Sequence, residues 1–77
     1  MNIERLVSMA NEISVFFASE SPPDQAAHDV AEHLHRFWEP RMRRQIIAHL
    51  EENAGAGLSD LARQAVQTLA AERAGGA

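Results

Sequence analysis

Apolar residues recur at helical spacing in four segments of the chain, and short stretches that contain proline, glycine, serine or asparagine separate these segments. The first segment predicts a helix from Ile3 to about Ala18, with Asn2 as its N-cap. Its apolar residues cover about half of the helix circumference, which is wider than the stripe of an ordinary surface helix. We therefore expect this helix to lie between two others or to be shared with another chain. The apolar face consists of Ile3, Leu6, Val7, Met9, Ala10, Ile13, Phe16 and Phe17.

The second segment predicts a helix from about Pro22 to Phe37, with Ser21 as its N-cap and proline in the first turn. Its apolar stripe is narrow, as in a helix that packs on one side of a small bundle. The stripe consists of Ala27, Val30, Leu34 and Phe37.

A third helix is expected from Pro40 to about Glu52, and a fourth begins after Ser59, its expected N-cap. Between them, Asn53, Gly55 and Gly57 are suited to ending a helix and forming a loop. The core-facing residues are expected to be Met42, Ile46, Ile47 and Leu50 in the third helix, and Leu61, Ala62, Ala65, Val66 and Leu69 in the fourth.

Four short helices with short connections predict an all-α fold, a small bundle with a corner at Pro40 between the second and third helices. We expect one helical domain over residues 1–72 and a flexible tail over residues 73–77. Large apolar residues are few, and a core of this size rarely contributes more than about 3–5 kcal/mol of net stability. We therefore expect another protein to complete the broad face of the first helix or the corner.

The corner segment, residues 37–44, contains the only tryptophan and three of the seven arginines. Arg41, Arg43 and Arg44 occupy the first turn of the third helix, where the partial positive charge of the helix favours acidic residues. Exposed arginines there cost about 0.3–1 kcal/mol each. Docking of an anion or an acidic partner surface would explain this placement. The alternative is that these arginines are solvated or paired with nearby glutamates.

Trp38 has two interpretations that the spacing leaves open. It can plug the corner between the two helices, with Arg41 stacked on its ring as a cation–π pair. It can equally be an interface residue, because tryptophan and arginine dominate the energetics of protein contacts. Arg43 falls between core positions in the helical projection, so we expect it to be paired at the edge of the core.

Charge and composition narrow the possible functions. The formal net charge is -4 and the chain contains no lysine, which argues against non-specific binding to nucleic acid. No apolar run approaches the roughly 18–20 residues of a membrane span, and no targeting signal is visible at the N-terminus. The absence of cysteine excludes disulfides and thiolate metal ligands.

No catalytic grouping is found in the sequence. His28, Glu32 and His35 share one side of the second helix, and two histidines with a carboxylate form a familiar ligand set for iron or zinc. That side lies opposite the apolar stripe, so we interpret it as a solvated face. Lone histidines such as His33 and His49 are expected on helix surfaces. We predict no catalytic activity, no metal site and no cofactor in this chain.

Two stretches resemble the delta subunit of soluble NAD-dependent formate dehydrogenases. One is the opening Met1 to Ile13 with Phe16 and Phe17 after it. The other is the segment from 33 to 44, with its run Phe-Trp-Glu-Pro-Arg-Met-Arg, and Gly57-Leu58-Ser59 adds a weaker match. The resemblance implies a cytoplasmic enzyme that contains a molybdenum or tungsten pterin cofactor, iron–sulfur clusters and FMN, and that oxidises formate with NAD.

The resemblance also implies what this chain does in such an enzyme. It would be a non-catalytic accessory subunit that supports assembly, cofactor insertion or stability through contacts with the catalytic (alpha) subunit and the other subunits. The competing hypothesis is a free-standing small helical regulator or adaptor. The candidate contacts with the catalytic subunit are Met9, Phe16, Phe37, Trp38, Pro40, Arg41, Met42, Arg43 and Arg44.

Overall fold

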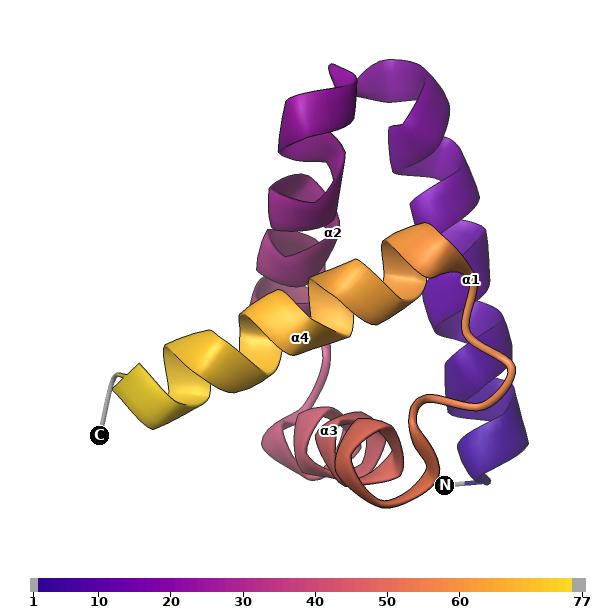
Figure 1. Ribbon diagram of the computed structural model, residues 1–77, viewed down its shortest axis with the longest axis vertical. Coiled ribbons are helices and arrows are strands. Elements are labelled where there is room, and N and C mark those ends of the chain that lie inside the picture. Colours follow the sequence, from indigo (N-terminus) through magenta and orange to yellow (C-terminus); the bar gives the residue numbers. More distant parts are fainter. Residues whose placement is uncertain (1, 76–77) are drawn as a thin grey trace.

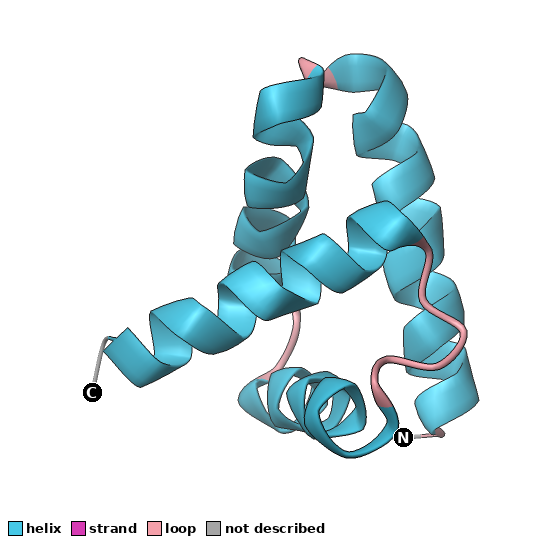
Figure 2. Ribbon diagram, viewed as in Figure 1, coloured by secondary structure: helices cyan, strands magenta, loops and turns pink. Residues whose placement is uncertain are grey.

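The computed structural model describes residues 2–75, and every regular element in that range is an α-helix (Figures 1 and 2). The predicted all-α fold is confirmed, and the expected helix bounds agree to within about two residues. The helices are α1 (Ile3–Glu20), α2 (Pro23–Phe37), α3 (Pro40–Asn53) and α4 (Asp60–Gly75).

The helices α1 and α2 run side by side as an antiparallel hairpin, α4 crosses both, and α3 lies across the open end of the hairpin (Figure 1). Because α1 packs against each of the other three helices, most of its broad apolar face is covered within the chain. This is the first of the two arrangements expected for that helix. The buried core consists of Leu6, Ala10, Val30, Ala31, Leu34, Trp38, Ile46, Ile47, Leu58, Ala62, Ala65, Val66 and Leu69.

Two polar residues at the start and in the middle of α1 form hydrogen bonds with its backbone. Asn2 caps the helix as predicted, because its side-chain Oδ1 accepts a hydrogen bond from the Glu4 N–H at 2.7 Å. Ser14, a polar residue outside the predicted apolar face of this helix, is buried. Its hydroxyl donates to the Ala10 carbonyl at 2.8 Å. A small side chain that bonds within its own helix can therefore occupy a core position.

The start of α2 also differs from the prediction. Pro22 rather than Ser21 is the N-cap, and no side-chain hydrogen bond caps the helix. The Ser21 hydroxyl instead donates to Asp29 Oδ2 at 2.6 Å, which ties the α1–α2 turn to the second turn of α2. Pro23 begins the helix, where the missing N–H of proline would be unpaired in any case.

The buried side of α2 is rotated slightly from the predicted stripe, so that Ala27 is only half-buried. Phe37 was expected in the stripe, but its side chain is 70% exposed. It is the last residue of α2. At this end of α2 the other helices no longer cover the apolar stripe, so the Phe37 ring lies on the surface. The buried residues of α2 are Ala26, Val30, Ala31 and Leu34.

The loop between α3 and α4 contains three residues with positive φ. Ala54, not a glycine, ends α3 in the left-handed region with φ 56°, and Gly55 and Gly57 follow with positive φ. Left-handed backbone is unfavourable for alanine, so the surrounding contacts must hold it there. Ser59 caps α4 as predicted, because its Oγ accepts from the Ala62 N–H at 3.2 Å.

Asn11 holds this loop against α1, a role that helical periodicity does not indicate. Its Nδ2 donates to the Gly57 carbonyl at 3.0 Å, and its Oδ1 accepts from the Ser59 N–H at 2.9 Å. One amide therefore satisfies a donor and an acceptor of the loop at the point where α4 is about to start. It joins residues that are 46 and 48 positions apart in the sequence.

We expect Asn11→Ala to destabilise the chain by about 1–2 kcal/mol, because two hydrogen bonds are lost at once. For a domain of this size, that loss lowers the melting temperature by roughly 4–15 °C. Thermal unfolding followed by circular dichroism measures the change. Glu12→Ala, at the neighbouring exposed position, is the matched control. Equal melting temperatures for the two variants would show that Asn11 does not hold the loop.

The helix α4 continues to Gly75, which is inside the predicted tail of residues 73–77. Gly76 and Ala77 lie outside the described residues, and the flexibility of the tail stays a prediction. Within residues 2–75, no helix is both long enough and apolar enough to span a lipid bilayer.

Candidate partner-binding surface

The turn between α2 and α3 takes two residues. The Trp38 N–H donates to the Leu34 carbonyl at 3.0 Å and closes α2, while Glu39 is the N-cap of α3 and Pro40 its first helical residue. The Glu39 side chain does not cap the helix. The helix therefore breaks at the position that Pro40 predicts. The first turn of α3 contains no acidic residue.

Trp38 lies in the hydrophobic core and is only 5% exposed. Within the described part of the chain, its ring forms no aromatic or cation–π pair, and Arg41 is exposed. The geometry therefore favours the interpretation of Trp38 as the plug of the corner. The expected stacking of Arg41 on the indole is not found.

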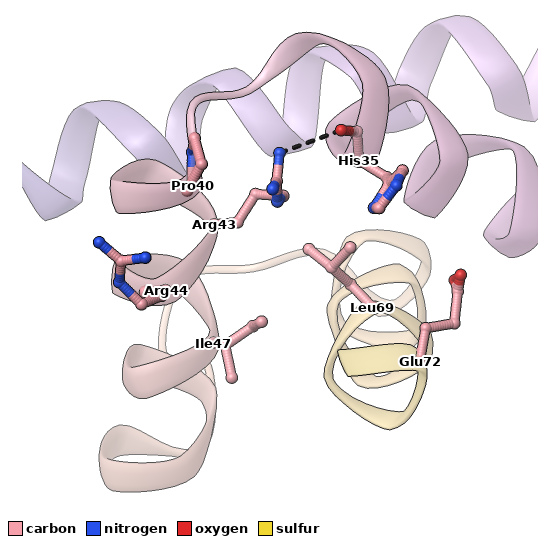
Figure 3. Close-up of a pocket in the computed structure, with 7 residues that line it drawn as sticks. All are labelled: His35, Pro40, Arg43, Arg44, Ile47, Leu69 and Glu72. Carbon is pink, nitrogen blue, oxygen red and sulfur yellow. Dashed lines mark hydrogen bonds between the residues drawn. The ribbon is translucent and has the colours of Figure 1, made fainter. Parts of the chain in front are cut away.

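Arg43 fastens the corner from the side of α3. Its Nη1 donates to the Trp38 carbonyl at 2.6 Å. The same nitrogen donates to the His35 carbonyl at 3.0 Å, the contact drawn in Figure 3. These carbonyls belong to the C-terminal end of α2, where backbone oxygens lack helical partners and carry partial negative charge. The expectation that Arg43 is paired at the edge of the core is confirmed, but its partners are backbone carbonyls rather than carboxylates.

A cavity of about 350 Å³ lies beside the corner, between α3 and α4 (Figure 3). Ile47 and Leu69 point into it from the two helices, with Arg44 on the α3 side and Glu72 on the α4 side. Its lining does not pair a nucleophile with a base. The full lining is His35, Pro40, Arg43, Arg44, Ile47, Leu69 and Glu72.

Four rings form a continuous aromatic row across α1 and α2, made of Phe16, Phe17, His33 and Phe37. Phe16 meets Phe17 edge-to-face with ring centroids 5.0 Å apart, and Phe17 meets His33 at 5.9 Å. His33 then meets Phe37 at 4.7 Å. The two end rings are largely in solvent, since Phe16 is 58% and Phe37 is 70% exposed. The aromatic row is thus a pre-positioned apolar surface.

His33 is half-buried within this row, so its interpretation as a lone surface histidine was wrong. The spacing of His33 and Phe37, four residues apart on one helix, could have indicated their contact. The contact with Phe17 joins two helices and needs the fold. A shallow hollow of about 330 Å³ beside the row is lined by Phe17, Asp29, Glu32, His33, Arg36 and Phe37.

On the histidine and carboxylate face of α2, Glu32 contacts a neighbour on either side. Glu32 lies 3.3 Å from His28 Nε2 and 3.6 Å from Arg36 Nε, and all three side chains are about half or more exposed. His35 is exposed one turn further on. Among the residues that the structure describes, no group of three or more potential ligands is placed to hold a metal ion.

Charged residues at the two ends of α3 oppose the helix dipole. Arg41 and Arg44 lie in or beside its first turn, and Glu51 and Glu52 lie near its end, where no basic residue is present. All four are exposed, and none forms a side-chain hydrogen bond or ion pair with another described residue. Their pairing with nearby charges, one of the two sequence-based alternatives, is therefore not found among the side chains of residues 2–72.

A family model for the delta subunit of NADH-dependent formate dehydrogenase, FdsD, matches residues 5–66 of the 77-residue chain. The chain belongs to this family. The resemblance carried by the two sequence stretches is thereby confirmed, and FdsD is a subunit family of a formate dehydrogenase. Comparisons with curated proteins and with solved structures found no match.

The FdsD match includes all nine predicted contact residues, and the structure divides them into two groups. One group builds the corner: Trp38 is buried, Met42 and Arg43 are half-buried, and Pro40 begins α3. The other group has accessible side chains on the outside of this delta-subunit fold. Its exposed members are Phe16, Phe37, Arg41 and Arg44, and Met9 is half-buried against the core.

Proposed function

We propose that this chain is a non-catalytic accessory subunit of a cytoplasmic NAD-dependent formate dehydrogenase, and that it binds the catalytic subunit through the aromatic row. Its role is to support assembly, cofactor insertion or stability of the complex. The molybdenum or tungsten pterin cofactor, the iron–sulfur clusters and the flavin implied for the enzyme would all belong to other subunits.

The observation that carries the proposed contact is the exposure of Phe16 and Phe37 on the aromatic row. Large exposed apolar side chains that lie together are typical of protein contact sites. Because Phe17 and His33 already hold the rings in place, binding costs little additional side-chain entropy. Met9 lies two turns before Phe16 on the same side of α1 and would extend the contact.

The corner residues have different roles in this proposal. Trp38, Pro40, Met42 and Arg43 act indirectly, because they fix the angle between α2 and α3 and thus the position of Phe37. Arg41 and Arg44 remain free to meet an acidic surface in the assembled complex.

We expect Phe16→Ala and Phe37→Ala each to weaken binding to the catalytic subunit. Truncation of an aromatic residue at the centre of an interface costs about 2 kcal/mol or more, which is roughly 30-fold in Kd. The measurement is co-purification of the catalytic subunit with a tagged chain from the native host, together with formate oxidation in the same extract.

Val15→Ala is the matched control, because Val15 is 72% exposed on α1 but lies outside the aromatic row. Circular dichroism would verify that all three variants keep their helices. Unchanged co-purification with the double Phe16→Ala/Phe37→Ala variant would reject the aromatic row as the contact. A chain recovered unattached from its host, with formate oxidation intact after its deletion, would favour a free-standing regulator instead.

A further inference from the structure

The outward face of α3, defined by Arg41, Arg44, Ala48, Glu51 and Glu52, has a charge pattern that the fold does not explain. The four charged side chains are exposed, and no described residue of the chain pairs with them. Each pair also opposes the helix dipole at its own end of α3. A chain selected for folding alone would carry these charges in the opposite order.

The positions of the charges follow from helix geometry. At about 100° and 1.5 Å per residue, Arg41 and Glu52 lie within about 20° of each other around α3 and roughly 16 Å apart along it. Arg44 and Glu51 also lie within about 20° of each other, roughly 10 Å apart along the axis. Each edge of the outward face therefore has one arginine and one glutamate. Ala48, a small half-buried residue, lies between the two edges.

The charges on this face match opposite charges on a second α3 that runs in the opposite direction. A twofold axis that lies in the contact plane, perpendicular to the helix, places a second α3 antiparallel to the first. This rotation brings each edge of one copy against the same edge of the other. Arg41 then faces Glu52 of the second copy, and Arg44 faces Glu51. The midpoints of the two pairs are one residue apart, about 1.5 Å along the helix, so a single axis serves both. All four possible ion pairs can form together.

We propose that two copies of this chain associate through the outward faces of α3, packed antiparallel with Ala48 near the twofold axis. The small side chain lets the two backbones approach, and the second copy supplies the opposite charge at each end of the helix. The acidic surface that receives Arg41 and Arg44 is thus a second copy. This inference goes beyond the proposed function, because it uses a different face and does not depend on the aromatic row.

The association is weak on physical grounds. Surface ion pairs contribute little each, and one helix pair is at the small end of known interfaces. The dimer should therefore form at high concentration and dissociate as salt screens the charges over about 10 Å at 0.1 M. Sedimentation equilibrium of the full chain up to roughly millimolar concentration, at low and high salt, measures this.

Charge exchange tests the pairing directly. The variants Arg41→Glu/Arg44→Glu and Glu51→Arg/Glu52→Arg should each be monomeric, and an equimolar mixture should form a heterodimer. The variant with all four changes should dimerise again, because it restores the pattern in reverse order. If the outward face of α3 instead binds a different protein, the variant with all four changes would not recover binding. A monomeric wild-type chain under all conditions, or a monomeric fourfold variant, would overturn the proposal.

A second measurement applies in the host, where the chain is present with its partners. The sequence contains no cysteine, so Ala48→Cys introduces the only thiol of the chain. Mild oxidation should link two copies through this residue, because near a twofold axis the two Cβ atoms come within disulfide distance. Ser8→Cys, at an exposed position on α1, should not link. Equal linking of the two variants, or none with Ala48→Cys, would contradict the antiparallel α3 pair.

Discussion

Trp38→Ala should leave the chain largely unfolded at room temperature. Replacing a buried tryptophan with alanine costs about 3–5 kcal/mol through lost burial and the cavity left behind. A helical chain of this size has only about 3–5 kcal/mol of net stability from its core. Because Trp38 is buried between elements that otherwise contribute mainly alanine, valine, leucine and isoleucine, the remaining side chains cannot fill the space.

Far-UV circular dichroism and a thermal melt would measure this loss. Trp38→Phe keeps an apolar ring and should show an intermediate melting temperature. Phe37→Ala, which changes the exposed neighbour, should melt close to the wild-type chain. A Trp38→Ala variant that folds normally but no longer binds the catalytic subunit would contradict the plug and restore the interface interpretation.

The second large effect is expected at Arg43. Arg43→Ala removes both hydrogen bonds to the C-terminal carbonyls of α2, which are donated by a charged group. Such bonds contribute about 1.5–3 kcal/mol each in favourable cases, and the half-exposed setting reduces the total to about 2 kcal/mol. For this length, the melting temperature falls by roughly 8–15 °C.

Arg44→Ala is the control for this experiment, because Arg44 is exposed and bonds to no described residue. It should melt like the wild-type chain. Arg43→Lys keeps the charge but not the planar guanidinium, so it should retain part of the stability. If Arg43→Ala and Arg44→Ala melt alike, the corner is not fastened by Arg43.

The helix bounds could be predicted because their signals are local. Pro40 disfavours helix in the residue before it and favours helix in those after it, and Asn2 and Ser59 cap the helices that follow them. These effects act over one turn and do not depend on the rest of the fold. The same reasoning misplaced Ser21. An N-cap hydroxyl accepts from a backbone N–H of the first turn, whereas the Ser21 hydroxyl donates to Asp29 Oδ2 and does not cap α2.

Exposure at the candidate surface could not be predicted in the same way. Periodicity assigns a face only inside a helix, while Phe37 ends α2 and Trp38 follows it. Which of the two neighbouring rings is buried depends on where α3 lies against the hairpin. The contact of Phe17 with His33 likewise depends on how α1 and α2 are rotated against each other. Both depend on how the helices pack against each other, which residue spacing within one helix cannot predict.

The single tryptophan also gives the molecule a built-in optical probe. Its indole is enclosed where α2 turns into α3, so its fluorescence should be blue-shifted in the native chain and red-shifted when that junction opens. Docking on outer surfaces would leave the emission nearly unchanged. Spectral shifts would therefore separate loosening of the junction from recruitment of another protein without any attached dye.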